Sequence, residues 1–98
     1  MSFSLMLNIP ALDPDQFRMA PALCHLPQVS RSDVARYLIT VGLGHLPEEI
    51  ERGAVSGVRI RLNIPEWMDE ALYREAASRR VSIAMVARCA LDLGRDQV

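Results

Sequence analysis

The sequence predicts an α+β fold, mostly helical, in which one domain of 98 residues contains two copies of a strand–helix–helix unit. Two observations support this prediction. The tetrapeptide Leu-Asn-Ile-Pro at residues 7–10 recurs at residues 62–65, and the pattern of Ser, Val-Ala-Arg and Gly in residues 30–42 recurs in residues 82–94. Both copies also place a strand-like pattern before two helix-like patterns. Matching blocks in the same order indicate an internal duplication.

Each copy begins with an expected strand. Every second residue of 2–9 is a large apolar one, starting at Phe3, and the same alternation runs through residues 57–64, starting at Val58. A period of two is typical of a strand with one buried face. Pro10 and Pro65 follow the two segments. We expect the strands to end there because proline cannot donate a ladder hydrogen bond.

The second unit carries the clearer helical patterns. Pro65 suits a helix start, and acidic residues follow it in the first turns of a helix expected to reach Arg80. Trp67 is expected to be partly buried in the core. Ser82 is a suitable N-cap for the next helix, and Gly94 is a suitable C-terminal stop.

The first unit is expected to follow the same order with a less regular first helix. That helix is predicted over residues 13–24, with Cys24 on its buried face. Pro21 lies inside it, and a proline within a helix costs about 3 kcal/mol or forces a kink. The second helix, over residues 30–42, starts with Ser30 and Asp33 in the arrangement of a capping box.

The repeat predicts a first unit at 1–42, a linker at 43–57 with one or two helical turns at 46–52, and a second unit at 58–98. A unit of about 40 residues cannot bury its apolar surface alone, and its strand has two open edges. We therefore expect the strands to pair as a two-stranded antiparallel ribbon, with four main helices over its apolar face. Six side chains then lie on the outward face: Ser4, Met6, Asn8, Arg59, Arg61 and Asn63.

The chain resembles the Arc/MetJ-like ribbon-helix-helix family of DNA-binding proteins. The segment Arg59-Ile60-Arg61-Leu62-Asn63-Ile64-Pro65, the helix after it and the helix that opens at Ser82 carry the resemblance, which the first unit repeats. It implies a tandem ribbon-helix-helix pseudo-dimer formed by one chain. It also implies that the outward strand residues enter the major groove of double-stranded DNA, and that the second helix of each unit contacts a phosphate through its N-terminus.

Arg59 and Arg61 are the strongest candidates for reading DNA bases, because one arginine can bond both acceptors on the edge of a guanine. Asn63 and Asn8 suit adenine by the same logic, while Ser4 and Met6 are weaker candidates. The alternative interpretation is that these are solvated side chains on an exposed strand face. Met6 also suits a protein-binding surface, because its side chain adapts to irregular contacts.

Phosphate contacts are expected at two helix N-termini, where free backbone N–H groups attract anions. Ordinary helix capping is the alternative role of these residues. Arg36 and Arg88 are expected on outer helix faces, in a structural or solvated role. The expected phosphate-contacting residues are Ser30, Arg31, Ser32, Ser82 and Ile83.

Composition limits the other function classes. The net charge is −1 and all 11 basic residues are arginines, so any nucleic-acid contact has to come from a local patch. Cys24 and Cys89 lack a metal-binding spacing and are expected to be buried, reduced cysteines. His25 and His45 are isolated, and nothing pairs a nucleophile with a base. We expect no metal, no cofactor and no enzymatic activity. We find no signal peptide or membrane-length stretch, and we expect a cytoplasmic protein.

Two functional hypotheses follow. The leading one is a small sequence-specific DNA-binding protein that acts as a transcriptional repressor or as an accessory factor of a mobile element. The second is a protein-binding regulator: an antiactivator, an antitoxin-like inhibitor or an anti-defence protein. The near-neutral charge, the neutral first strand and the acidic residues 48–51 favour the second. We expect the units to pair within one chain, because linkage raises their effective concentration. Pairing between chains and further self-association on DNA are alternatives.

Overall fold

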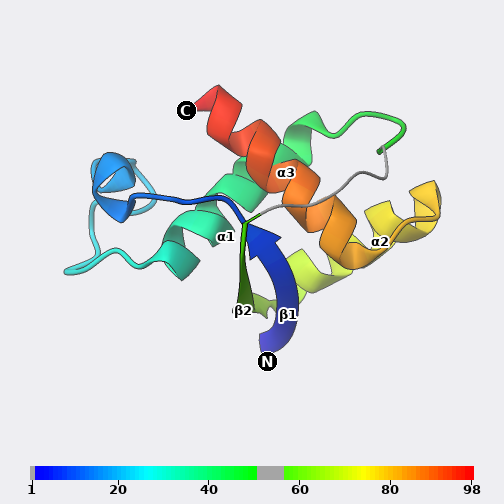
Figure 1. Cartoon of the computed structure of the whole chain (residues 1–98), viewed down its shortest axis with the longest axis horizontal. Coiled ribbons are helices and arrows are strands. Elements are labelled where there is room, and N and C mark those ends of the chain that lie inside the picture. Colours follow the sequence, from blue (N-terminus) through cyan, green and yellow to red (C-terminus); the bar gives the residue numbers. More distant parts are fainter. Residues whose placement is uncertain (1, 51–56) are drawn as a thin grey trace.

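Two strands, three α-helices and two short 3₁₀ helices form the chain in the computed structural model, which describes residues 2–50 and 57–98 (Figure 1). Helix α3 crosses α1, the strand pair lies on one side of this crossing, and α2 flanks the strands. The elements in chain order are β1 (Ser2–Ile9), η1 (Pro14–Phe17), α1 (Arg31–Gly42), η2 (Leu43–His45), β2 (Val58–Pro65), α2 (Glu66–Arg79) and α3 (Ile83–Gln97).

The two strands form an antiparallel sheet in which Met6 faces Arg61 at the centre. Side chains alternate between the two faces of the sheet, as the period of two requires. Four of the inward side chains are buried in the core: Leu7, Ile9, Leu62 and Ile64. The sheet therefore contributes one wall of the core, and its other face is free for solvent or a ligand.

The core lies between the sheet and the three α-helices. Every fully buried large side chain in the described residues is apolar, and no polar or charged residue there is buried. The helices contribute the following residues to it: Val34, Leu38 and Ile39 from α1, Met68 and Leu72 from α2, and Val86 and Leu91 from α3.

Helices α1 and α3 make the closest helix contact, through two glycines. A Cβ atom on Gly42 would lie 1.7 Å from the carbonyl oxygen of Ala90, and one on Gly94 would lie 2.0 Å from that of Leu38. Only glycine allows backbones to approach this closely. Gly94 does not end its helix as expected: α3 continues to Gln97, and the glycine permits the close packing against α1 instead.

The prediction of a tandem ribbon-helix-helix pseudo-dimer with four main helices is wrong, because the described residues form three α-helices. The helix predicted at 13–24 is replaced by η1 and a series of turns. Pro21 has no N–H, so the turns close instead through bonds such as Ala20 N–H to Phe17 C=O, at 3.0 Å, and Leu23 N–H to Ala20 C=O, at 2.9 Å. Leu23 of this segment, and Leu12 just before it, are still buried against the core.

Three smaller expectations also differ from the structure. Trp67 is 52% exposed because it lies on the outer side of α2. Cys24 is exposed, since its segment is not the helix that would have turned it inward, and Cys89 is only partly buried. In the linker, the regular turn is the 3₁₀ helix Leu43–His45, and residues 46–50 form no helix. The rest of the predicted linker helix, residues 51 and 52, lies outside the described part of the chain.

Candidate nucleic-acid interface

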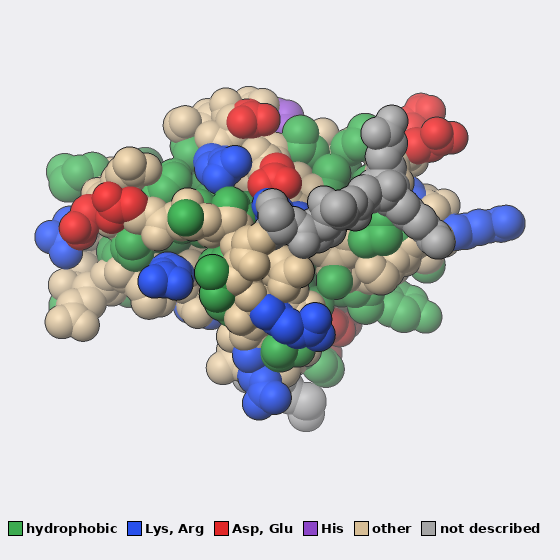
Figure 2. Space-filling model, viewed as in Figure 1, with side chains coloured by type: hydrophobic (Ala, Val, Ile, Leu, Met, Phe, Trp, Pro, Cys, Tyr) green, Lys and Arg blue, Asp and Glu red, His purple; other side chains and the backbone are tan. Residues whose placement is uncertain are grey.

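The outward face of the sheet, here called the ribbon face, consists of Ser4, Met6, Asn8, Arg59, Arg61 and Asn63. All of them are exposed except Asn8, which is partly buried. Figure 2 shows basic side chains gathered at the end of the molecule formed by the strands, while most of the acidic side chains in this view lie over other parts. The six residues proposed from the sequence for base reading thus lie together on one accessible surface.

The ribbon face has two chemically different ends. At one end Asn8 faces Arg59, and at the other Ser4 faces Asn63. The Ser4 hydroxyl donates to Oδ1 of Asn63 at 3.2 Å, so part of the Asn63 amide is already bonded within the protein. One end therefore presents a guanidinium, and the other presents two neutral polar groups in contact with each other.

The start of α3 lies beside the arginine end. A groove of about 190 Å³ between them is lined by Asn8 and Arg59 from the strands and by Met85 and Arg88 from α3. Ser82 caps the helix by accepting the Met85 N–H at 3.1 Å, and the first turn carries no acidic residue. The helix dipole and Arg59 therefore make this end favourable for an anion.

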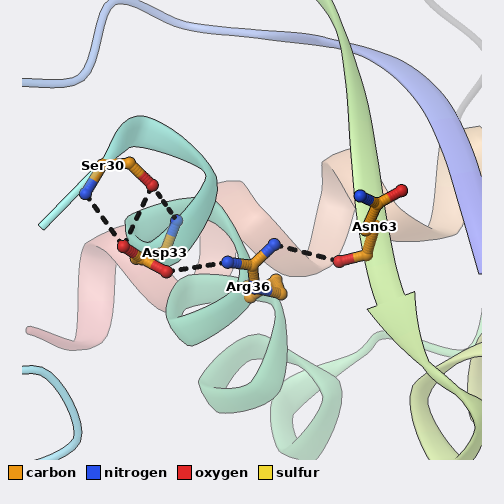
Figure 3. Close-up of polar contacts among 4 residues, drawn as sticks. All are labelled: Ser30, Asp33, Arg36 and Asn63. Atoms are coloured by element: carbon orange, nitrogen blue, oxygen red, sulfur yellow. Dashed lines mark hydrogen bonds and ion pairs between the residues drawn. The ribbon is translucent and has the colours of Figure 1, made fainter. Parts of the chain in front are cut away.

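The start of α1 carries its own negative charge, on Asp33 (Figure 3). The Asp33 carboxylate accepts the Ser30 N–H at 2.9 Å, and the Asp33 N–H donates to the Ser30 hydroxyl at 3.1 Å, which completes the expected capping box. The Ser30 N–H is the main cause that lowers the pKa of Asp33, with help from the Ser30 hydroxyl and Arg36. A phosphate at Ser30, Arg31 or Ser32 would meet this carboxylate.

Arg36 and Arg88 bond the two strands to the helices in equivalent ways. Arg36 of α1 donates from Nη1 to the carbonyl oxygen of Asn63 at 3.0 Å, as Figure 3 shows, and from Nη2 to Asp33 at 2.7 Å. Arg88 of α3 donates from Nη1 to the carbonyl oxygen of Asn8 at 2.8 Å, and its Nε pairs with Asp92 at 3.1 Å. Each arginine thus holds the strand of the other predicted unit beneath the ribbon face.

Sequence reasoning missed two parts of this surface. It gave no role to Met85, and it did not find the contacts of Arg36 and Arg88 with the strands. The recurrence of Val-Ala-Arg at residues 34–36 and 86–88 was a signal for the two arginines, because equal positions in both copies suggest an equal structural role. The side chain of Met85 follows no repeat pattern that could have identified it.

Comparisons with protein-family models, with curated proteins and with solved structures gave no match for this chain. No helix within residues 2–50 and 57–98 is long and apolar enough to cross a membrane. The same two ranges contain no cluster of three or more His, Cys, Asp or Glu residues placed to hold a metal ion.

Proposed function

We propose that this protein binds double-stranded DNA by placing the ribbon face in the major groove. The observation that carries the proposal is the exposure of Arg59 and Arg61 on the same side of a two-stranded sheet, with Asn8 and Asn63 beside them. The major groove is wide enough for a two-stranded ribbon. Arginine recognises guanine and asparagine recognises adenine there through paired hydrogen bonds.

We further propose that the DNA site is asymmetric. The arginine end of the ribbon face lies beside the start of α3, and the first turn of α3 has no acidic residue. A phosphate bound at this end would contact Ser82 and Ile83 at the N-terminus of the helix. At the end of the ribbon face formed by Ser4 and Asn63, the nearby Asp33 carboxylate accepts the hydrogen bond of the Ser30 N–H, and its negative charge repels a phosphate. Such a surface favours guanine contacts on one side of the site and weak contacts on the other.

The resemblance of the strand and helix segments to ribbon-helix-helix repressors supports a regulatory role. The protein would act in the cytoplasm as a transcriptional repressor or as an accessory factor of a mobile element. The proposed activity is binding and needs no catalytic step or cofactor.

The test begins with selection of bound duplexes from a random library, which supplies a target sequence. Arg59→Ala with Arg61→Ala is then compared with the wild type over a salt series. We expect a loss of about 1–3 kcal/mol of discrimination for each arginine that reads a base and a shallower dependence of affinity on salt. The matched control is Arg18→Ala with Arg74→Ala, which removes two charges away from the ribbon face and should keep both affinity and sequence preference. Unchanged affinity and salt slope in the first pair would overturn the proposal.

A second candidate is a protein-binding regulator, which the exposed aromatic residues of α2 favour. Trp67 is 52% exposed and Tyr73 is 65% exposed, and aromatic residues are enriched in protein interfaces. Under this alternative, no duplex is preferred over random competitor even at low salt, and Trp67→Ser with Tyr73→Ser weakens binding to the partner. The library selection separates the two candidates, since only the first yields an enriched sequence.

A further inference from the structure

A cavity lined by residues 11–21, Tyr37 and the end of α3 lies away from the ribbon face. Its volume is about 580 Å³, and it opens between residues 11–21, α1 and the last turn of α3. This volume is within the range of small-molecule binding pockets. The apolar part of its lining comes from residues 11–21, chiefly Leu12, Phe17 and Ala20, and from Val98 after α3. The polar side chains of the lining are Gln16, Tyr37 and Arg95.

The cavity exists because residues 13–24 do not form a regular helix. The 3₁₀ helix η1 and the turns after it, interrupted by Pro21, carry Phe17 and Ala20 along one wall of the cavity. Both side chains pack against the core and are only partly buried. Apolar surface in this wall is therefore open to a ligand that reaches into the cavity.

Arg95 supplies the one cationic group of the cavity lining. It lies in the last turn of α3 and is exposed, and it forms no ion pair with any residue in the described ranges. By contrast, Arg36 pairs with the carboxylate of Asp33, and Arg88 pairs with that of Asp92. A guanidinium that borders an apolar cavity and lacks such a partner suits a ligand carboxylate, which it can bind through two parallel hydrogen bonds.

We propose that this cavity binds a small organic acid with an apolar chain or ring. The carboxylate lies at Arg95, within reach of the polar groups of Tyr37 and Gln16, and the apolar body packs against Phe17, Ala20 and Leu12. Charge complementarity selects an anion over a neutral ligand, and the apolar wall selects an aliphatic or aromatic acid over inorganic phosphate. This site is independent of the ribbon face and of the DNA binding proposed above.

The test is calorimetric titration of the full chain with 3-phenylpropionate and, as a neutral match of the same shape, 3-phenylpropanamide. We expect saturable binding of the acid with an affinity at least about tenfold above that of the amide, because hydrogen bonds to a charged group are the stronger ones. Chemical-shift changes in an NMR titration should centre on residues 11–21, Tyr37 and Arg95.

Two substitutions separate the charge from the apolar wall. Arg95→Gln should lower the affinity for the acid about tenfold and leave that for the amide unchanged. Phe17→Ala should weaken both ligands. Arg74→Gln, at an arginine of α2 that is also exposed, serves as the charge-matched control and should change neither affinity. Thermal unfolding of each variant verifies that it remains folded.

Several results would overturn the proposal. Equal affinities for the acid and the amide would show that Arg95 does not bind the carboxylate. An unchanged affinity of Arg95→Gln for the acid would show the same. If the wild-type protein shows no saturable binding of the acid, the cavity is not a binding site for such ligands. Shift changes confined to the ribbon face would place the acid on the arginines of the strands instead.

Discussion

At the scale of single residues, Asp33 links helix capping to pH. Its carboxylate accepts hydrogen bonds from Ser30 and pairs with Arg36, and these contacts lower its pKa. A group whose pKa is lower in the folded state stabilises the fold above its unfolded pKa, which is about 3.9 for aspartate. That contribution is lost as the pH falls through the lower, folded pKa.

The first prediction follows from this linkage. Asp33→Ala should lower the free energy of unfolding by about 1 kcal/mol at pH 7, the usual effect of a lost helix cap. The difference from the wild type should shrink as the pH falls below about 4, because the unfolded chain takes up the proton first, and it should vanish once the pH is below the lowered pKa of the folded Asp33 carboxyl. Urea unfolding at a series of pH values measures both effects. The control is Asp15→Ala, which removes an exposed ion pair with Arg18 and should change the free energy of unfolding by no more than about 0.5 kcal/mol. A stability difference between Asp33→Ala and the wild type that does not depend on pH would contradict the assignment to Asp33.

The second residue-scale prediction concerns the arginines that hold the strands. Arg88→Met should lower the free energy of unfolding by about 1–3 kcal/mol, because the carbonyl of Asn8 loses a charged donor. Arg36→Met should cost less, since the Arg36 side chain is 32% exposed and that of Arg88 is 16% exposed. Chemical denaturation provides the comparison, with Arg74→Met as the control for methionine itself. Equal stability of the three variants would show that the strand contacts contribute little.

At the scale of elements, the crossing of α1 and α3 depends on its two glycines. Gly42→Ala places a Cβ atom against the backbone of Ala90, and Gly94→Ala places one against Leu38, so the helices must separate. We expect each variant to lose about 1–3 kcal/mol of stability, the usual cost of overpacking. Gly44→Ala is the matched control, because a Cβ there has no neighbour within 4 Å. Thermal unfolding of the three variants measures the differences, and a similar loss at all three positions would disprove the packing role.

The sequence was most informative where local signals agree with the tertiary structure. The predicted strands at 2–9 and 57–64 correspond to β1 and β2, and the helix predicted at 30–42 corresponds to α1, because alternation and capping act over a few residues. The prediction failed at residues 13–24. There the duplication suggested a helix that Pro21 does not allow to continue, and the structure follows the local chemistry of this proline.

The candidate site was predictable in part for the same reason. Period-two alternation places Arg59, Arg61 and their neighbours on one face without any tertiary information. The groove beside α3 and the reach of Arg36 to Asn63 depend on how distant segments pack. A single sequence does not contain that distance information in any local pattern. The cavity at Arg95 likewise depends on where an irregular segment settles against two helices.

At the scale of the whole molecule, one chain supplies both strands of the sheet. We therefore predict a molar mass near that of the single chain, 10.9 kDa, by light scattering without DNA. We also predict a thermal midpoint that does not change over a wide range of protein concentration, because a unimolecular transition has no mass-action term. A mass near twice this value, together with a midpoint that rises with concentration, would show that the strands pair between chains.

The pairing of β1 with β2 has a consequence for synthesis. β1 leaves the ribosome early, and its hydrogen-bonding partner follows only after α1 and the connecting segment have been made. Contacts between segments so far apart slow folding, and unpaired apolar strands promote aggregation in the meantime. A nascent chain that stalls before residue 58 would expose the side chains of Phe3, Leu5 and Leu7 with no second strand to pair with. The order of translation thus leaves β1 without its hydrogen-bonding partner until β2 has been made, so β1 is the strand that stays unpaired for longer.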